Sequence, residues 1–420
     1  MPKRKCSRRN IRRRLPICIA ALYFAVRAAV GAEPPAPAQG TVRFASFNIE
    51  VLSAEKLRSV DAAGRGNHAQ LLKAAEILQR IRPEVLLINE IDYDGPAEEE
   101  PTASEVGRLE QSGAANSATR FRDLYLQVSQ NGQKPLDFPH LFYRPSNTGI
   151  PTGKDLDNDG KTDGPADAFG YGKYPGQYGM VLYSRFPIAT VAARTFRKFR
   201  WADMPENLMP DGMNGKPEFY SADEVAVFRL SSKSHWDVPV QIGQNVVHVL
   251  ASHPTPPIFD GPEDSNGRRN FDEIRLWADY ISGGDRAAYI SDDSGKKGGL
   301  PPHVEFVIMG DLNADPVRNE QPYGKAAVRQ LLDLPAVQDP KPKSIGSPLA
   351  PHAVELEDYL PYRTSNFGRI DYCLPSRGLK VSASGVFWPD PGDQLHDLVD
   401  PPDPASDHFA VWTDLVLPGT

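Results

Sequence analysis

Cysteine is the first thing this 420-residue chain has little of. Two of its three cysteines, Cys6 and Cys18, lie in the first 32 residues, which leaves Cys373 alone in the rest of the chain. A disulfide framework and a cysteine-based zinc site both need several cysteines, so the sequence excludes them beyond that segment. Cys373 lies in a strand-like apolar stretch, where we expect a buried and unreactive thiol.

Apolar runs long enough to cross a membrane are also missing. The best candidate, residues 15–26, ends at Arg27, whereas a membrane-spanning helix needs about 20 apolar residues. The first 32 residues hold nine basic residues and no acidic one, and small residues at 30–32 offer a cleavage site. This layout is typical of a signal peptide, exported by the general secretory or the twin-arginine route. We therefore expect a signal peptide over 1–32, a disordered spacer over 33–40, and a secreted or periplasmic protein.

Positive charge is scarce once that segment is set aside. The chain has 47 basic and 54 acidic residues and a formal charge of −7. Without the nine basic residues near its start, 38 remain and the formal charge is about −16. Such a surface repels polyanions, and no basic stripe with interleaved aromatics is present. Tight non-specific binding of nucleic acid is therefore not expected, although bound divalent cations would let an acidic nuclease work.

Proline and glycine, in contrast, are plentiful, with 40 and 34 residues. They concentrate between short apolar runs, and no repeat of fixed period is present. This pattern favours one core with long irregular insertions, so we expect a single domain over residues 41–417. Apolar spacing predicts helices over 67–81 and 270–281, and paired strands over 225–230 and 239–250.

Six short apolar runs end beside a residue that can ligate a metal or transfer a proton. Buried strands have this apolar character, and side chains at strand ends converge where sheets meet. Six such endings in one chain predict a single site. The polar residues at these endings are Asn48, Glu90, His253, Asp311 with Asn313, Asp371, and Asp407 with His408.

These residue types suit the hydrolysis of a phosphate ester with a divalent cation. Glu90 and Asp407 can supply carboxylate oxygens to Mg²⁺ or Mn²⁺. His408 and Asp371 can form a dyad in which the carboxylate fixes the imidazole tautomer and strengthens the base. His253 offers a second imidazole for the opposite side of the phosphate.

The same segments resemble the endonuclease/exonuclease/phosphatase superfamily, whose best-known member is pancreatic deoxyribonuclease. Each motif alone is weak evidence, but together they follow the family's order across residues 41–415. The matching segments are Phe47-Asn48-Ile49-Glu50, Ile88-Asn89-Glu90, Ser252-His253-Pro254, Gly310-Asp311-Leu312-Asn313, Arg369-Ile370-Asp371-Tyr372 and Ser406-Asp407-His408.

The resemblance implies an α/β fold, a four-layer sandwich of two mixed, mostly antiparallel sheets packed face to face with helices outside. It also implies a metal site. Glu90 would be the main ligand for Mg²⁺ or Mn²⁺, and Asn48 and Asp407 would lie near the metal or the phosphate.

The resemblance further implies the catalytic roles. Asp311 and Asn313 would bind and polarise the phosphate and the water. His408, paired with Asp371, would be the general base, and His253 would be the acid or a phosphate donor. The sequence leaves open which histidine is base and which is acid.

A second acidic cluster lies in a glycine-rich stretch. Asp155, Asp157, Asp159 and Asp163 occupy positions 1, 3, 5 and 9 of a calcium-loop pattern, with glycine at position 6. Ala166 stands where the bidentate glutamate of that pattern is expected. A loop ordered by structural Ca²⁺ and a plain acidic surface turn are the two interpretations.

Two cations near the His253 segment form another candidate. Arg268 and Arg269 precede a predicted helix, so they could contact a substrate phosphate or form the solvated start of that helix.

The function predicted from these observations is a secreted, divalent-metal-dependent phosphoester hydrolase, either phosphodiesterase or phosphatase. An extracellular nuclease is the alternative within the same chemistry. A non-catalytic binding protein that keeps the fold is the alternative of another class. We expect a monomer whose partner is a phosphoester substrate.

Overall fold

Two β-sheets form the centre of the fold, and their strands coincide with most of the apolar runs. The structure is a computed structural model that describes residues 33–95, 115–210, 219–317, 324–344, 346, 360–400 and 402–417. Within these residues one sheet has six strands, ordered β10-β11-β1-β2-β4-β3, and the other has five, ordered β5-β6-β7-β8-β9. The strands are β1 (Thr41–Leu52), β2 (Val85–Ile91), β3 (His140–Phe142), β4 (Gly179–Ser184), β5 (Arg194–Thr195), β6 (His235–Ile242), β7 (Asn245–Ser252), β8 (Glu305–Asp311), β9 (Asp371–Pro375), β10 (Lys380–Val386) and β11 (Val411–Val416).

Each sheet contains one parallel pair of strands joined by a helix. β1 and β2 are parallel and joined through α2 (Ala69–Ile81), and β7 and β8 are parallel and joined through α6 (Ser265–Ser282). The other neighbouring strands are antiparallel. Parallel strands need such crossover connections, which place helices on the sheet faces. The remaining helices of the described residues are α1 (Ala54–Arg58), α4 (Ser117–Phe121), α5 (Ala222–Val225), α7 (Gly284–Ala287) and α8 (Arg329–Leu332), with short helical turns η1 (Arg122–Leu126), η2 (Pro165–Asp167), η3 (Thr190–Ala192), η4 (Trp201–Asp203), η6 (Leu360–Tyr362) and η7 (Gln394–Leu398).

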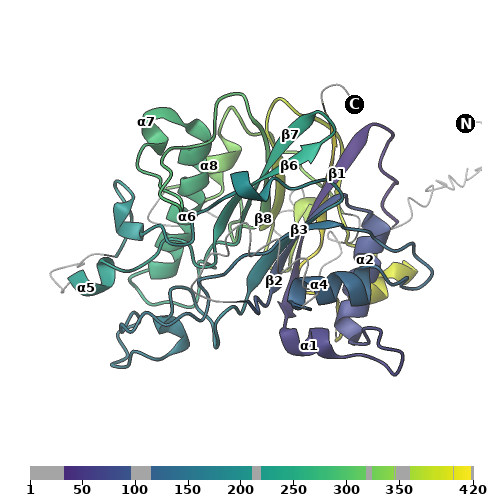
Figure 1. Cartoon of the computed structure of the whole chain (residues 1–420), viewed down its shortest axis with the longest axis horizontal. Helices are drawn as coiled ribbons and strands as arrows, with labels where there is room; N and C mark the ends of the chain where they lie inside the picture. The colour runs from purple at the N-terminus through teal and green to yellow at the C-terminus, as the bar shows by residue number, and fades with distance from the viewer. Residues whose placement is uncertain are drawn as a thin grey trace, which may run out of the picture. The chain divides into compact units, whose positions relative to one another are not determined.

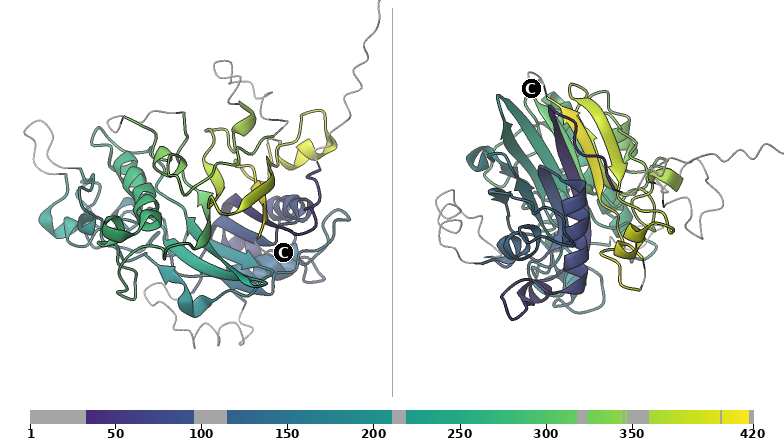
Figure 2. Two further views of the ribbon diagram at one scale, coloured as in Figure 1. Left: turned by 90° about the horizontal axis from the view of Figure 1, so that it is seen from above. Right: turned by 90° about the vertical axis from the view of Figure 1, so that its right-hand side faces the viewer.

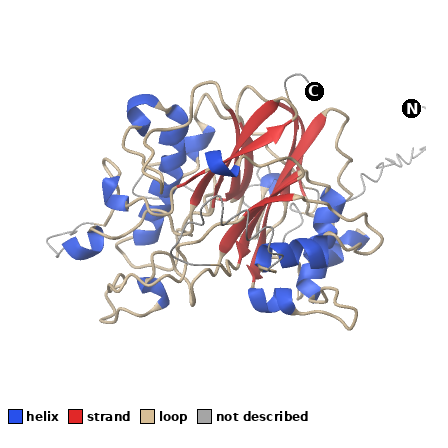
Figure 3. Cartoon of the chain, viewed as in Figure 1, coloured by secondary structure: helices blue, strands red, loops and turns tan. Residues whose placement is uncertain are grey.

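Side chains alternate between two cores along the strands. Val249 of β7 and Val307 of β8 belong to the core that also contains the first sheet. Their neighbours Leu250 and Ile308 point the other way and pack with Trp277 of α6 in a second core. Figures 1 and 3 show the sheets between α1, α2 and α4 on one side and α6, α7 and α8 on the other, and in Figure 2, right, α2 lies in front of the strands. The predicted four-layer sandwich is confirmed.

The two predicted helices are present. Leu71, Ala74 and Leu78 are buried on one face of α2, which ends at Arg82 in the left-handed conformation (φ 61°), just before Pro83. Pro83 cannot continue the hydrogen-bond ladder, so the chain turns into β2. The second helix, α6, begins five residues before its predicted start.

The predicted pairing of strands 225–230 and 239–250 is wrong. Ser221 and Glu224 form a capping box, and this local hydrogen bonding places Val225 at the end of the short helix α5. The second segment lies in the hairpin β6–β7, which turns at Gly243 with φ 59°. Glycine adopts this conformation without steric cost, so the apolar stretch divides there into two strands.

The predicted signal peptide, residues 1–32, lies outside the described residues. Residues 33–40 contain no helix or strand, yet they contact the domain. Glu33 forms an ion pair with Arg80 of α2 at 2.5 Å, and the Pro35 carbonyl accepts a hydrogen bond from Arg43 at 2.8 Å. These contacts anchor a segment that we expected to be a disordered spacer. No described helix combines the length and the apolar character that a bilayer crossing requires.

A buried ion pair joins β1 to β11. Arg43 Nε and Nη2 lie 2.6 and 2.8 Å from the two carboxylate oxygens of Asp414, and the guanidinium stacks 4.0 Å above Trp412. Arg43 Nη1 also donates to the Ile81 carbonyl at the end of α2. Removing one member would leave the other charge buried without compensation.

We therefore expect Asp414→Ala to lower the free energy of unfolding by about 3–5 kcal/mol, because the Arg43 guanidinium would keep its burial and lose its anion. Chemical denaturation measures the change. Asp203→Ala, which removes the exposed Arg200–Asp203 pair, is the matched control and should change stability little. Equal effects of the two variants would contradict the assignment of Arg43–Asp414 as a structural pair.

Candidate active site

Strand ends from the two sheets meet at one place and exchange hydrogen bonds. Asn48, in β1, donates from Nδ2 to Glu90 of β2 at 3.2 Å and to Asp311 of β8 at 3.0 Å. The backbone N–H of Asp311 also lies 3.3 Å from the Asn89 side-chain oxygen. The polar ends of β1, β2 and β8 are therefore held together across the gap between the sheets.

The backbone is irregular where these strands end. Glu90, Asn313, Val51 and Tyr178 all have positive φ, at 68°, 51°, 50° and 58°. The register between β1 and β2 shifts after Asn48, and that between β2 and β4 shifts next to Glu90. Such bulges redirect side chains, and positive φ in residues other than glycine costs about 1–3 kcal/mol each. Strained backbone concentrated at one spot is typical of functional sites.

Asp311 lies between the two imidazoles. Its Oδ2 atom is 3.4 Å from His253 Nε2 and 3.8 Å from His408 Nε2, and the side chain is buried. Burial opposes ionisation, but the imidazoles of His408 and His253 hold the pKa of Asp311 below its ordinary value. The carboxylate is therefore an ionised acceptor facing both histidines.

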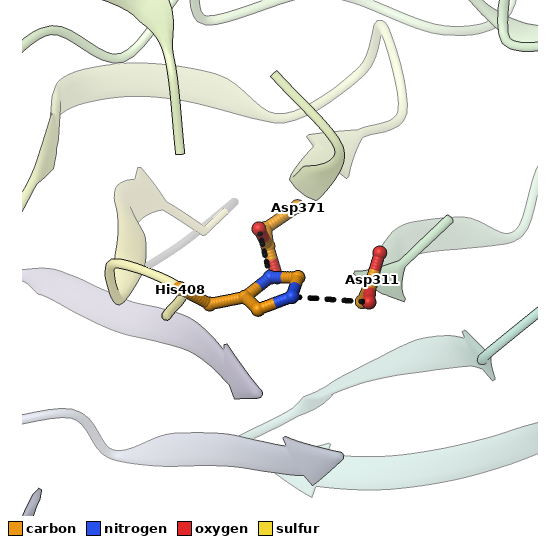
Figure 4. A group of neighbouring side chains, drawn as sticks. All are labelled: Asp311, Asp371 and His408. Atoms are coloured by element: carbon orange, nitrogen blue, oxygen red, sulfur yellow. Dashed lines mark hydrogen bonds and ion pairs between the residues drawn. The ribbon is translucent and has the colours of Figure 1, made fainter. Parts of the chain in front are cut away.

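His408 and Asp371 form a buried pair, shown with Asp311 in Figure 4. His408 Nδ1 lies 2.9 Å from Asp371 Oδ2, and Thr364 donates its hydroxyl to the same oxygen at 2.8 Å. Burial opposes the charge on His408, but Asp371 and then Asp311 raise its pKa well above the ordinary value. Burial also raises the pKa of Asp371, an effect that His408 opposes. The carboxylate fixes Nδ1 as the protonated nitrogen, so Nε2 faces Asp311.

His253 has the opposite electrostatics. Burial lowers its pKa, and the nearby Lys233 ammonium lowers it further, while Asp311 opposes both effects. Its Nδ1 atom is buried and has no hydrogen-bond partner among the described residues. At neutral pH His253 is therefore a neutral imidazole, in contrast to His408.

The acidic side of the site suits a cation. Burial raises the pKa of Glu50, and the neighbouring Asp407 and Glu90 carboxylates add to the shift. Burial likewise raises the pKa of Asp407, where Glu90 again acts in the same direction. The side-chain oxygen Oδ1 of Asn48 is buried and accepts no hydrogen bond within the described chain. Several hard oxygen donors that repel one another, with an unpartnered amide oxygen beside them, form a donor set that a divalent cation fits.

Asn313 completes the set of predicted residues. Its backbone N–H donates to Asp311 Oδ1 at 2.9 Å, and its side-chain amide donates to the Pro254 carbonyl at 3.1 Å. Its left-handed φ is tolerated because asparagine enters this region more readily than most residues. Asn313 thus lies between the β8 end and the loop that follows His253.

The supporting roles of three residues were not predicted from the sequence, although Ser406 lies in one of the matching segments. Thr364 binds Asp371, as described above. Ser406 donates its hydroxyl to the Asn48 carbonyl and accepts from the His408 N–H, so it links two strand ends. Lys233 approaches the His253 loop from the segment before β6. Neither their type nor their spacing distinguishes these residues from other polar loop residues.

The comparisons with known proteins agree with this geometry. The model of the endonuclease/exonuclease/phosphatase family matches residues 45–408. The chain belongs to this family. Members of the family hydrolyse phosphoester bonds, and this member is a phosphoester hydrolase. No match was found among curated proteins.

Solved structures with a similar fold include other members of the family. One from Beutenbergia cavernae is 17% identical over 90% of this chain and 72% of its own, with a TM-score of 0.48. A mannosyl-6-phosphatase from Bacteroides thetaiotaomicron is 13% identical over 90% of this chain and 100% of its own, with a TM-score of 0.41. Caenorhabditis elegans TDP2 is 13% identical over 89% of this chain and 97% of its own, with a TM-score of 0.39.

Arg268 and Arg269 both lie within α6, and their guanidinium groups donate to backbone carbonyls. Arg269 is buried and donates to the backbone carbonyls of Leu230, Phe169 and Arg229. Arg268 donates to the carbonyl of Glu263 at 3.0 Å. These guanidinium groups fasten loops to α6, and a phosphate contact by either arginine stays a prediction from the sequence.

The acidic loop lies in an insertion of the family domain. The carboxylates of Asp155, Asp157 and Asp159 approach within 4.8 Å of one another, and Asp163 is not in that group. The Asp155 carboxylate accepts from the backbone N–H groups of Asp159 and Gly160, which also stabilises a turn without an ion. Calcium binding here stays a prediction from the sequence.

We expect calcium to raise the melting temperature of the wild-type protein and Asp157→Ala/Asp159→Ala to abolish the rise, because an ion that binds only the native state stabilises it. Thermal denaturation with calcium or a chelator checks this. An Asp123→Ala variant, which removes an exposed carboxylate elsewhere, is the control. If calcium leaves the wild-type melting point unchanged, the loop is a plain acidic turn.

Proposed function

We propose that the protein is a secreted or periplasmic, divalent-metal-dependent hydrolase in which the His408–Asp371 pair activates a water molecule for attack on phosphorus. The observation that carries the proposal is the buried chain of Asp371, His408 and Asp311 in Figure 4. A carboxylate, an imidazole and a second acceptor in series are the arrangement that general-base catalysis requires.

The dyad would hold and move the proton. Asp371, fixed by Thr364, orients the ring through Nδ1, so that Nε2 is left to accept a proton from water. Asp311, on the Nε2 side, would orient the water and stabilise the imidazolium that forms. His408 must be neutral before it can accept a proton from water. After the transfer, the carboxylates of Asp371 and Asp311 stabilise the imidazolium that has formed.

Glu90, Asn48 and Asp407 would hold the divalent cation, Mg²⁺ or Mn²⁺. When bound there, the cation would polarise a phosphoryl oxygen and, as a nearby positive charge, disfavour the proton on His408. Glu90 is positioned for this by its hydrogen bonds from the Val51 N–H and from Asn48. The left-handed backbone of Glu90 fixes the side chain further.

The opposite side of the site would bind the phosphate. The Asn313 side-chain amide would donate a hydrogen bond to the developing negative charge. His253 is neutral because burial lowers its pKa, and its single N–H faces Asp311, so it would position that carboxylate rather than act as a general acid. Asp311 keeps the His253 ring in place through Nε2.

Two alternatives are separated from this proposal by one experiment. An extracellular nuclease would cleave plasmid DNA or RNA, against the acidic composition, and a binding protein would turn over nothing. The experiment is a phosphoester panel with Mg²⁺, Mn²⁺ and Ca²⁺: bis-p-nitrophenyl phosphate, p-nitrophenyl phosphate, nucleic acids, lipid head groups and sugar phosphates. Absence of turnover above the metal-only blank across the whole panel would reject the enzyme.

Glu90→Gln should remove most of the metal affinity and activity while leaving the fold intact, because an amide replaces a charged hard ligand. Isothermal titration with Mn²⁺ and the initial rate on bis-p-nitrophenyl phosphate measure the two effects. Glu84→Gln is the control, because Glu84 immediately precedes β2 and so lies at the opposite end of this strand from Glu90. Wild-type metal affinity in Glu90→Gln would place the metal site elsewhere.

His408→Ala should lower kcat by about 10²–10⁴-fold with a much smaller effect on KM, because the imidazole acts in the transition state. Asp371→Asn should give a smaller loss of the same kind. The double variant should lose little more than His408→Ala alone, since Asp371 acts only through the ring. If the loss in the double variant equals the product of the two single losses, the residues act independently and the dyad assignment is refuted.

A further inference from the structure

A lysine approaches the phosphate side of the site, and the mechanism above does not use it. Lys233 precedes β6 and is 7% exposed. Its ammonium donates to the Pro254 carbonyl at 3.4 Å, a long contact for one of three available donors. Among the described residues no carboxylate lies within ion-pair distance of Nζ. A lysine is almost never buried this deeply without an anionic partner.

The segment that carries Lys233 is fixed at several points. The Lys233 carbonyl accepts from the Asn147 N–H at 2.9 Å. Glu273 of α6 accepts from the Ser232 N–H at 2.7 Å and from the Thr255 N–H at 2.6 Å, so one carboxylate fastens this segment and the loop after His253. At Gly170 a Cβ would overlap the Ser232 carbonyl oxygen, so the chain on the other side is also packed tightly. The backbone that carries the lysine is therefore held in place.

The position of the ammonium relative to the site follows from a shared acceptor. The Pro254 carbonyl accepts both from Lys233 Nζ and from the Asn313 side-chain amide, at 3.4 and 3.1 Å. Two donors on one oxygen lie close together, so the ammonium is beside the amide that we assign to the phosphate. Ser232 also donates to the His253 carbonyl at 3.3 Å. Lys233 and Asn313 thus form a pair of neighbouring donors, and Ser232 ties the lysine's segment to the backbone of His253.

A purely structural role accounts poorly for this arrangement. Among the nearby charges, Glu273 has the largest effect on the pKa of Lys233. Its two carboxylate oxygens already accept backbone N–H groups, however, and it makes no ion pair with Nζ. Burial lowers the pKa of Lys233, while Glu273, Glu90 and Asp311 favour its charged form. An ammonium held in such a field, with donors to spare, lacks an anion in direct contact.

We propose that Lys233 is a substrate-binding residue whose ammonium contacts a non-bridging phosphoryl oxygen beside the Asn313 amide. The inference rests on the proposed phosphoester hydrolysis at this site, and it assigns the cation that offsets phosphate charge on the side away from Glu90 and Asp407. Inorganic phosphate, which presents the same oxygens, is the simplest ligand for this position.

The test compares Lys233→Met and Lys233→Gln with the wild-type protein loaded with Mg²⁺. Isothermal titration with inorganic phosphate should show affinity about 10–100-fold lower in both variants, since a hydrogen bond to a charged group contributes about 1.5–3 kcal/mol. KM for bis-p-nitrophenyl phosphate should rise more than kcat falls. Lys380→Met, which removes an exposed lysine on β10, is the control and should match the wild type.

Phosphate affinity and KM at wild-type values in a folded Lys233 variant would overturn the inference and leave the proposed function standing. No turnover by the wild type on the phosphoester panel would instead reject the proposed function. Should neither variant fold, trace acetylation of the wild type read by mass spectrometry decides the question. Saturating phosphate should then protect Lys233 several-fold relative to Lys380, and equal labelling with and without phosphate would overturn the inference.

Discussion

The contact on which the rest of the site depends is the one between the buried carboxylate of Asp311 and the donors around it. An ionised carboxylate can stay buried only where donors replace its hydration. Asn48 donates to it from the other sheet, and His253 and His408 lie on its remaining sides. This requirement fixes how β1 and β8 face each other, and through them where the proposed metal side and the proposed phosphate side of the site lie.

Much of this arrangement could be predicted from the sequence, because buried strands are short, apolar and ended by a change in polarity. Asn48, Glu90 and Asp311 each follow or close such a run, and the structure brings all three within one hydrogen-bonded group. The sandwich fold was predicted from the family resemblance, and the crossover helices α2 and α6 from apolar spacing. The order of six weak motifs carried more information than any one of them.

Other features could not be predicted because they depend on contacts between distant loops. The sequence places Arg269 before a predicted helix near His253, where it could contact a phosphate. In the structure it lies within α6, and three backbone carbonyls from other segments accept its hydrogen bonds. Lys233 lies in a serine-rich stretch without apolar periodicity, and only the fold places it beside the His253 loop. The strand predicted over 225–230 failed because the capping of α5 is a local preference that apolar content does not report.

The charge distribution favours cations on two sides of this site. Beyond the effect of burial, the carboxylate of Glu90 raises the pKa of both Glu50 and Asp407 on one side, where the proposed divalent cation would offset this repulsion. A substrate phosphate brings further negative charge, which that cation neutralises only on the face it touches. The far face of the phosphate therefore needs its own positive or donating groups. With His253 held neutral by burial, Lys233 is the cationic side chain that the fold places beside the Asn313 amide on that face.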